Sequence, residues 1–324
     1  MPTRRTEEVT ELVRGSFDRS DKIGLNALDS GRTFLLLERM RMLSSWRRLL
    51  ICFCVLLLAS FVAAAQEKKM ELSELLARHL EAVGSAAARG AIKSRFAAGT
   101  VKFVNRMGTS STLDGTIGLV SIHPKLRYSI KFPSISYSGE QLAFNGKKLD
   151  VGVLPGGVFT PLAQFMQQQD LGLKEGLLGG LLSTGWPLLK DPVAARLEYK
   201  GTKKIDRRFL HIVSYRPQKG SPDLKVTLYF DPETFRHVRS EYEFQIGARM
   251  GGGPNQSTKI PESHYLLSED FDDFRPVDGV TLPFKCKLQL SEQTSMNNIL
   301  RDWTLSFDQI THNQPIDDNV FTLK

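Results

Sequence analysis

The residue types that could perform catalysis or hold a metal are present in this chain but scattered. The six histidines stand at positions 79, 123, 211, 237, 264 and 312, and none pairs with another at the spacing of metal ligands. The sequence has no HExxH, CxxC, Walker or GxSxG motif, and no GxGxxG after a predicted strand. His211 and His237 lie in predicted strands that could be neighbours, and we interpret them as ordinary strand histidines. We expect a protein that is not an enzyme and that uses no cofactor.

An acidic run is the only segment that invites a calcium site: Glu269, Asp270, Asp272 and Asp273. It lacks the glycine and the terminal glutamate of an EF-hand loop. Its alternation with Phe271 and Phe274 predicts a solvated strand end instead, so we expect no metal there.

One cysteine remains in the part of the chain that we expect to fold. Cys52 and Cys54 lie in an apolar N-terminal segment, and Cys286 lies on the apolar side of a predicted strand. A single cysteine forms no internal disulfide. We expect a buried, inert thiol, and the alternative is a catalytic nucleophile.

Residues 40–65 have the pattern of a signal peptide. Arg47 and Arg48 precede an uncharged apolar stretch, residues 49–62, and three alanines at 63–65 offer a cleavage site. We expect cleavage after Ala65 and a soluble, exported product in the periplasm that starts at Gln66. The alternative is a retained N-terminal anchor, although a membrane span needs about 20 apolar residues. Residues 1–39 are interpreted as an extension that is disordered or that precedes the true start at Met40 or Met42.

The charge balance argues against a nucleic-acid partner. Ten of the 43 basic and seven of the 35 acidic residues lie in the first 65 positions, which leaves 33 against 28 in the rest. A net charge of +5 over 259 residues is mild for a protein that binds a polyanion along its length.

The periodicity of residues 66–324 predicts a single, mainly β domain of the α+β kind. Apolar residues recur at helical spacing over 71–83, Gly84 ends that helix, and Ser85 caps a second short helix that ends near Lys93. Strict alternation over 126–132, 225–230, 282–290 and 303–308 is typical of antiparallel strands with one apolar face. Turns are predicted at 145–146, 231–234 and 276–279, and a flexible loop at 251–255. We expect about ten strands in a curved sheet.

An apolar insert at residues 159–189 interrupts the strands. It is rich in Leu and Gly, and Pro161 could open a helix that Thr160 caps. Lys174 and Glu175 argue against a membrane span. We expect two short helices, joined near Gly172, that cover the apolar face of the sheet.

This order of elements resembles the LolA/LolB-like superfamily of outer-membrane lipoprotein-sorting proteins. The resemblance is carried by the helix at 75–84, the hairpin YFDPET at 229–234, the segment VDGVTLP at 277–283, and a last strand at 305–311 with a tail to Phe321. It implies an antiparallel half-barrel whose concave apolar face is covered by helices and holds acyl chains. No cysteine comes directly after the alanines at 63–65, where a lipid would be attached, which favours a soluble carrier over a membrane-anchored receptor. No family contact residue is carried over.

Both the sheet and the insert contribute candidate pocket residues. The candidates are Tyr128, Ile130, Phe132, Leu228, Phe284 and Trp303 from the strands, with Phe165, Met166, Leu177, Leu178 and Trp186 from the insert. The alternative is that these side chains form a plain core without a cavity. The leading hypothesis is a periplasmic carrier of an acyl lipid or lipoprotein, and the alternative is an envelope sensor or assembly protein that binds a protein segment.

Overall fold

The computed structural model describes residues 70–107, 109–168, 196–216, 224–247, 249–250, 259–260, 262–295 and 297–323. All of them belong to one compact unit, Lys69–Lys324. The predicted signal peptide, the extension before it and residues 169–189 of the insert lie outside the described part. None of the helices in the described ranges is long and apolar enough to cross a membrane.

Twelve strands form one antiparallel sheet in the order β5-β4-β3-β2-β1-β14-β13-β12-β9-β8-β7-β6. The strands of its first half are β1 (Ser94–Met107), β2 (Thr109–Ile122), β3 (Lys125–Lys131), β4 (Gln141–Phe144) and β5 (Leu149–Val151). Those of the second half are β6 (Arg196–Ile205), β7 (Arg208–Arg216), β8 (Lys225–Phe230), β9 (His237–Ile246), β12 (Ser263–Val277), β13 (Val280–Thr294) and β14 (Asn298–His312). The strands β10 (Arg249–Met250) and β11 (Lys259–Ile260) form a separate pair. The twelve strands of the main sheet alone exceed the ten expected.

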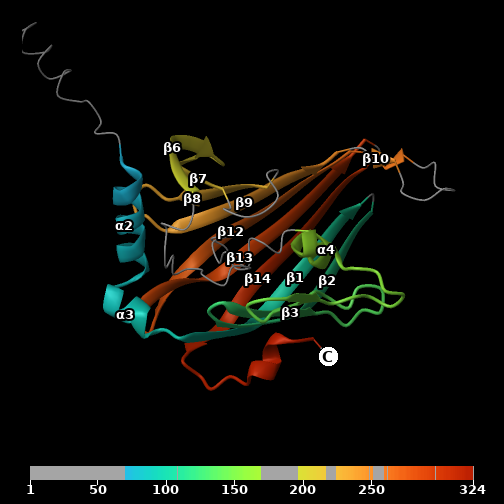
Figure 1. Cartoon of the computed structure of the whole chain (residues 1–324), viewed down its shortest axis with the longest axis horizontal. Helices are drawn as coiled ribbons and strands as arrows, with labels where there is room; N and C mark the ends of the chain where they lie inside the picture. The colour runs from blue at the N-terminus through green and yellow to red at the C-terminus, as the bar shows by residue number, and fades with distance from the viewer. Residues whose placement is uncertain are drawn as a thin grey trace, which may run out of the picture. The chain divides into compact units, whose positions relative to one another are not determined.

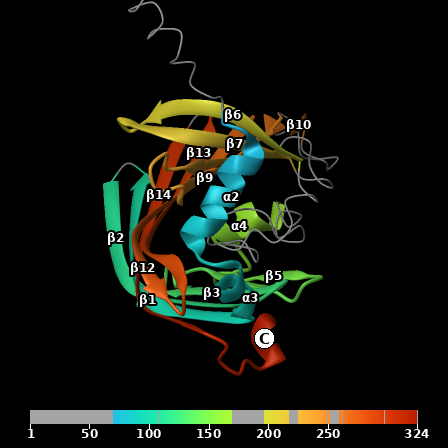
Figure 2. The same ribbon diagram turned by 90° about the vertical axis from the view of Figure 1, so that its left-hand side faces the viewer.

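The sheet is curved and does not close, as Figures 1 and 2 show. Its two edges are β5 and β6, so the chain between these strands runs from one edge of the sheet to the other. The helix α4 (Pro161–Gln168) belongs to this connection. In Figure 2 the strands pass from β6 and β7 above α4 to β3 and β5 below it. The predicted curved antiparallel sheet is confirmed.

Helix α2 (Leu72–Val83) and helix α3 (Ala86–Ala91) form where the sequence predicts them. The hydroxyl of Ser85 accepts a hydrogen bond from the Ala88 amide at 3.1 Å, which confirms its role as the cap of α3. A short 3-10 helix, η2 (Asp318–Phe321), ends the described chain. The first predicted helix of the insert is α4, and it begins at Pro161 as expected.

Glycine is required at one position where β1 pairs with β14. The register of this pair shifts between Ala98 and Gly99. A Cβ atom on Gly99 would come within 2.0 Å of the carbonyl oxygen of Ser306, so only glycine fits. The predicted turn before β13 also forms, with Asp278 and Gly279 both at positive φ.

One face of the sheet is apolar, as the alternation predicts. Along β13 the buried residues are Leu282, Phe284, Cys286, Leu288 and Leu290. Their counterparts on β3 and β14 join them in one hydrophobic cluster, and Leu75 and Val83 of α2 and three side chains of α4 pack into the same cluster. The described helices therefore rest on this face in part. The complete helical cover expected from residues 159–189 stays a prediction.

Candidate functional site

The structure brings the candidate pocket residues of the strands and of α4 together on the inner face of the sheet. The members within the described ranges are Tyr128, Ile130, Phe132, Phe165, Met166, Leu228, Phe284 and Trp303, and all are buried in the same cluster. Leu177, Leu178 and Trp186 lie outside the described residues. Burial of this kind suits a packed core as well as the walls of a closed binding site, so a cavity stays a prediction.

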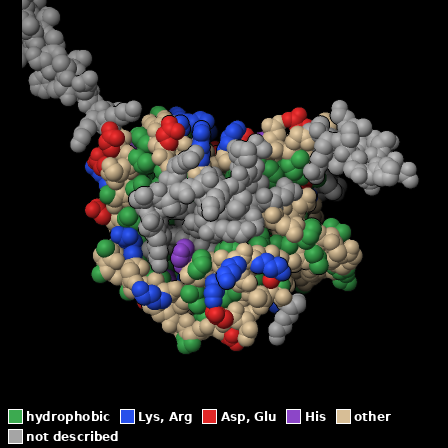
Figure 3. Space-filling model, viewed as in Figure 1, with side chains coloured by type: hydrophobic (Ala, Val, Ile, Leu, Met, Phe, Trp, Pro, Cys, Tyr) green, Lys and Arg blue, Asp and Glu red, His purple; other side chains and the backbone are tan. Residues whose placement is uncertain are grey.

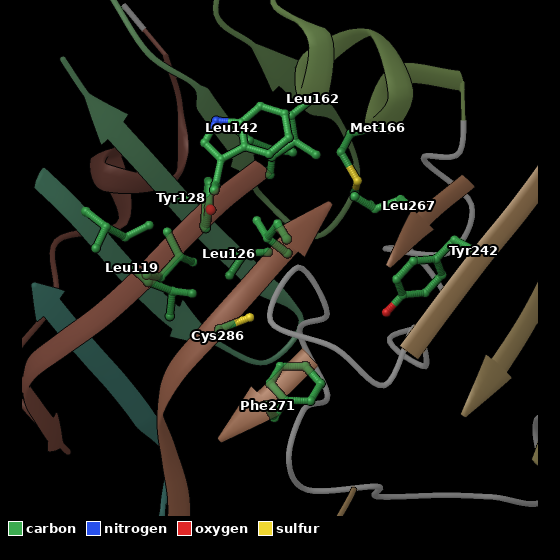
Figure 4. Packing of buried hydrophobic residues seen from close by; sticks show 14 of the residues in the cluster. Leu119, Leu126, Tyr128, Leu142, Leu162, Met166, Tyr242, Leu267, Phe271 and Cys286 are labelled. Carbon is green, nitrogen blue, oxygen red and sulfur yellow. The ribbon is translucent and has the colours of Figure 1, made fainter. Parts of the chain in front are cut away.

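Helix α4 reaches across the inner face. Phe165 contacts Phe244 of β9, with 5.2 Å between ring centroids, and Phe244 in turn stacks on Tyr265 of β12 at 4.9 Å. Figure 4 shows Leu162 and Met166 directed from α4 toward the strands. The other attachment of α4 is to the chain beside β3. In the sheet, β3 and β9 are separated by β2, β1, β14, β13 and β12, so this one helix connects distant strands.

The attachment beside β3 is a buried carboxylate, Glu140, only 2 % exposed. Its oxygens accept hydrogen bonds from the amides of Leu162 and Ala163 at 3.2 and 3.3 Å and from the hydroxyl of Thr160. The amides of Leu162 and Ala163 in the first turn of α4 are therefore satisfied by a residue that lies 22 and 23 positions before them. The sequence suggests Thr160 as the cap, but this hydroxyl donates to Glu140 instead.

Glu140 is itself held in place from two directions. Its backbone exchanges hydrogen bonds with Ile130, at 2.8 and 3.1 Å, which fixes it against β3. The hydroxyl of Tyr137 donates to its carboxylate at 2.7 Å and accepts from the indole nitrogen of Trp303 at 3.0 Å. A polar chain thus runs from Trp303 of β14 to the start of α4. Burial raises the pKa of Glu140 to about 7, against hydrogen bonds that lower it.

A second buried carboxylate lies inside the apolar face. Glu269 of β12 is 0 % exposed and accepts a hydrogen bond from the hydroxyl of Tyr242 at 2.7 Å. The expectation of a solvated strand end is therefore wrong for Glu269, because its strand position places it on the inner face. Asp270 and Asp272 are on the outer face, and within the described ranges no group of three or more His, Cys, Asp or Glu residues could hold a metal ion.

Two more groups near this region are buried. Burial and the charge of Glu269 raise the pKa of the Cys286 thiol, which keeps it protonated and supports the interpretation of an inert thiol. The hydroxyl of Tyr128 has no hydrogen-bond partner among the residues that the structure describes, although Tyr128 is 0 % exposed. A buried hydroxyl without a partner costs free energy, so this group is available to a ligand that offers an acceptor.

Three histidines that are far apart in the sequence meet at the α2 end of the sheet. His211 of β7 and His237 of β9 both pair in register with Phe230 of β8, one on each side. The expectation that their strands could be neighbours is therefore wrong, because β8 lies between them. The ring of His79, from α2, lies 5.0 Å from that of Phe230 and 6.4 Å from that of His237. Burial, and secondarily the charge of His79, lower the pKa of His237 to about 3. His237 therefore resists protonation.

A pocket of about 240 Å³ lies elsewhere, between the β6–β7 hairpin, β9 and β12. Its lining includes Arg208, Arg239, Asp270 and Asp272, and none of the candidate pocket residues. Arg239 already pairs with Asp270 at 2.7 Å. This small, charged pocket does not suit an acyl chain.

Comparison with known proteins gives likenesses of structure alone. No family model and no curated protein matches the sequence. The chain is similar to LolA superfamily protein NE2245 from Nitrosomonas europaea, with 12% identity, a TM-score of 0.41, and coverage of 78% of this chain and 98% of that one. An outer membrane lipoprotein-sorting protein domain from Vibrio parahaemolyticus matches with 10% identity, a TM-score of 0.39, and coverage of 76% and 95%. MucB from Pseudomonas aeruginosa, in its complex with MucA, matches with 12% identity, a TM-score of 0.20, and coverage of 75% and 99%.

The LolA-like resemblance indicated by the sequence is thus confirmed as a likeness to solved structures. At these identities and TM-scores the likeness says nothing about what this chain binds. The case for a function rests on its own inner face, on α4 and on the residues that hold α4 in place.

Proposed function

We propose that this protein binds an acyl lipid, free or attached to a lipoprotein, between the inner face of the sheet and α4. The observation that carries the proposal is the way α4 is attached. A helix of eight residues crosses an extensive apolar surface, and its polar anchor is one carboxylate, Glu140. Its apolar contribution is limited to the side chains of Leu162, Phe165 and Met166, with the small Ala163.

Such a helix can act as a lid. Its release would expose the surface around Ile130, Leu228 and Trp303, which suits hydrocarbon. It would also expose the Tyr128 hydroxyl, which could donate to the carbonyl oxygen of an acyl ester or amide. The buried pair of Tyr242 and Glu269 would add a polar end to an otherwise apolar site. These features support reversible capture of a chain with a polar group at one end.

The location that fits this role is the periplasm. The sequence of residues 40–65 predicts export, and a carrier of acyl chains is needed where these chains must cross water between membranes. We therefore place the protein among the soluble binding proteins of the cell envelope, with no covalent chemistry of its own.

A pair of substitutions on opposite faces of α4 tests the lid. Phe165→Asp puts a charge against Phe244, whereas Gln164→Asp puts the same charge on the exposed face. We expect Phe165→Asp to lower the affinity for a fluorescent fatty acid by at least about tenfold, because closing the lid then buries an unpaired carboxylate. Gln164→Asp should bind like the parent chain.

Native mass spectrometry of residues 66–324, with extraction of bound lipid, gives the direct readout. Co-purified acyl lipid supports the proposal and identifies its class. Equal binding by the two α4 variants, with the β-sheet circular dichroism signal intact in both, would show that α4 is plain core.

A second candidate function is the capture of a protein segment by strand addition. The observation in its favour is β6, a ten-residue strand at the edge of the sheet whose outer backbone groups face away from β7. The shift of register between Tyr199 and Gly201 weakens this template. Recovery of one envelope protein and no lipid in a pull-down would favour this alternative; the loop at 251–253, also considered for it, lies outside the described residues.

A further inference from the structure

The hairpin formed by β6 and β7 carries an unusual concentration of positive charge. Five of the nine residues from 200 to 208 are basic, Asp206 is the one acid among them, and all six are exposed. We call the basic residues the hairpin cluster: Lys200, Lys203, Lys204, Arg207 and Arg208. Figure 3 shows Lys and Arg side chains gathered over this hairpin at the upper margin of the molecule. Residues 66–324 as a whole have a net charge of +5, so these nine residues hold most of it.

Most of this charge is not neutralised within the protein. Arg208 pairs with Asp231 at 2.9 Å, and Lys200 pairs with Glu198. Lys203, Lys204 and Arg207 form no ion pair with any residue that the structure describes. The turn at Asp206 and Arg207 has φ values of 46° and 71°, which makes it a tight two-residue hairpin turn and presents these side chains at a projecting end.

A large apolar side chain lies among these cations. Phe209 is 61 % exposed, lies directly opposite Lys204 in the strand register, and has the Lys204 ammonium group 5.8 Å from its ring centroid. Lysines alone on an edge strand would be explained by protection against strand pairing. That explanation does not cover the arginine of the turn, the arginine at the start of β7, or the exposed phenylalanine, which protection of an edge would exclude.

We infer that the β6–β7 hairpin is a contact surface for a membrane rich in anionic lipid. The unpaired cations complement phosphate head groups, and the aromatic ring suits the boundary between head groups and acyl chains. This inference goes beyond the proposed function, because it does not require the inner face to bind anything. For a carrier it would supply the place where cargo is exchanged.

The test measures binding to vesicles of three parts phosphatidylcholine to one part phosphatidylglycerol, with pure phosphatidylcholine as reference. Residues 66–324 are used, because every described strand and the whole hydrophobic cluster lie in this unit, so it has a complete core of its own. We expect binding to the anionic vesicles only, and we expect added salt to weaken it.

Neutralising Lys203, Lys204 and Arg207 with glutamine should reduce binding about a hundredfold, since each cation at an anionic surface contributes about fivefold in affinity. Phe209→Ser should reduce it by a further factor on the order of ten. The matched control replaces Lys102, Lys131 and Lys147, which are exposed elsewhere and form no ion pair with a described residue. It changes the net charge equally and should leave binding within a few-fold of the parent chain.

Three outcomes would overturn the inference. The first is equal binding to the two kinds of vesicle. The second is an equal loss of vesicle binding in the hairpin triple variant and the control triple variant. The third is binding of the protein to an acidic peptide or single-stranded RNA without any binding to vesicles. Uptake of a fluorescent fatty acid, measured on the same variants, separates this test from the proposed function. If the hairpin triple variant still takes up the fatty acid but no longer binds vesicles, the result supports the hairpin as the membrane contact surface. If the parent chain binds vesicles but not fatty acid, the result contradicts the proposed carrier function and leaves the hairpin surface supported.

Discussion

Replacement of Glu140 by alanine is expected to release α4 from the sheet. The substitution leaves the hydroxyls of Tyr137 and Thr160 and the amides of Leu162 and Ala163 without their acceptor in a buried place. Removing one partner from such a buried network costs about 3–5 kcal/mol. Hydrogen exchange of the α4 amides should therefore accelerate by at least about a hundredfold.

The control for this experiment is Glu81→Ala, the same change at an exposed position of α2. It should leave exchange in α4 unaltered. Because the central strands β13 and β14 do not contact Glu140 through hydrogen bonds, their amides should stay protected in both variants. Slow exchange of α4 in Glu140→Ala would show that apolar packing alone holds the helix.

The pH dependence of the Glu140 contribution follows from the direction of its pKa shift. Its pKa rises from 4.5 to about 7 on folding, so the folded state holds the proton more tightly. The contribution is fully present below pH 4.5 and is lost as the pH rises to about 7, to the extent of about 3 kcal/mol. Glu140→Gln, which cannot titrate, should remove this slope from urea unfolding measured across that range.

Acid should destabilise the protein through His237, with a loss of similar size. The pKa of His237 falls from 6.5 to about 3 on folding, so the unfolded chain takes up the proton first. The contribution of His237 to the free energy of unfolding is fully present above pH 6.5 and is lost progressively as the pH falls toward about 3, by about 4 kcal/mol. His237→Gln keeps a partner for the Ser240 hydroxyl and should flatten this acid loss.

The matched control is His264→Gln. His264 is half-buried and lies beside Glu243 at 2.9 Å, away from the histidine cluster. The variant should keep the acid loss of the parent chain in the same unfolding series. A parent-like acid loss in His237→Gln would place the sensitive group elsewhere. Since His79 of α2 touches the same rings, we expect α2 to be the first element to loosen in acid.

These two groups act in opposite directions across the acidic range. Between pH 6.5 and 4.5, a fall in pH raises the stability of the fold through Glu140 and lowers it through His237.

Much of the local structure could be predicted from the sequence, because its causes are local. The stripe of leucines from Leu72 to Leu80 makes a helix wherever it finds an apolar surface, and the alternation around Tyr128 and Cys286 makes a strand with one buried face. Asp278 and Gly279 determine a tight turn by their own backbone preferences. Pro161 marks the first residue of α4 for the same reason.

The groups that distinguish the site could not be predicted in this way. Glu140 and Glu269 have the sequence surroundings of surface carboxylates, yet both are buried in the folded chain. The partners of Glu140 are Tyr137, three residues before it, and residues at the start of α4. The partner of Glu269 is Tyr242 of β9. The hairpin cluster was visible in the sequence as KGTKKIDRR, but the average charge of the chain conceals it.

The sequence by itself thus determined which segments become helices, strands and turns, and which face of each strand is apolar. Only the tertiary structure decided the order of the strands, the meeting of His79 with His237, and the anchoring of α4 by Glu140. The physical reason is that periodicity and turn chemistry act between residues a few positions apart. Burial of a charge depends on hydrogen bonds from residues that only folding brings within reach.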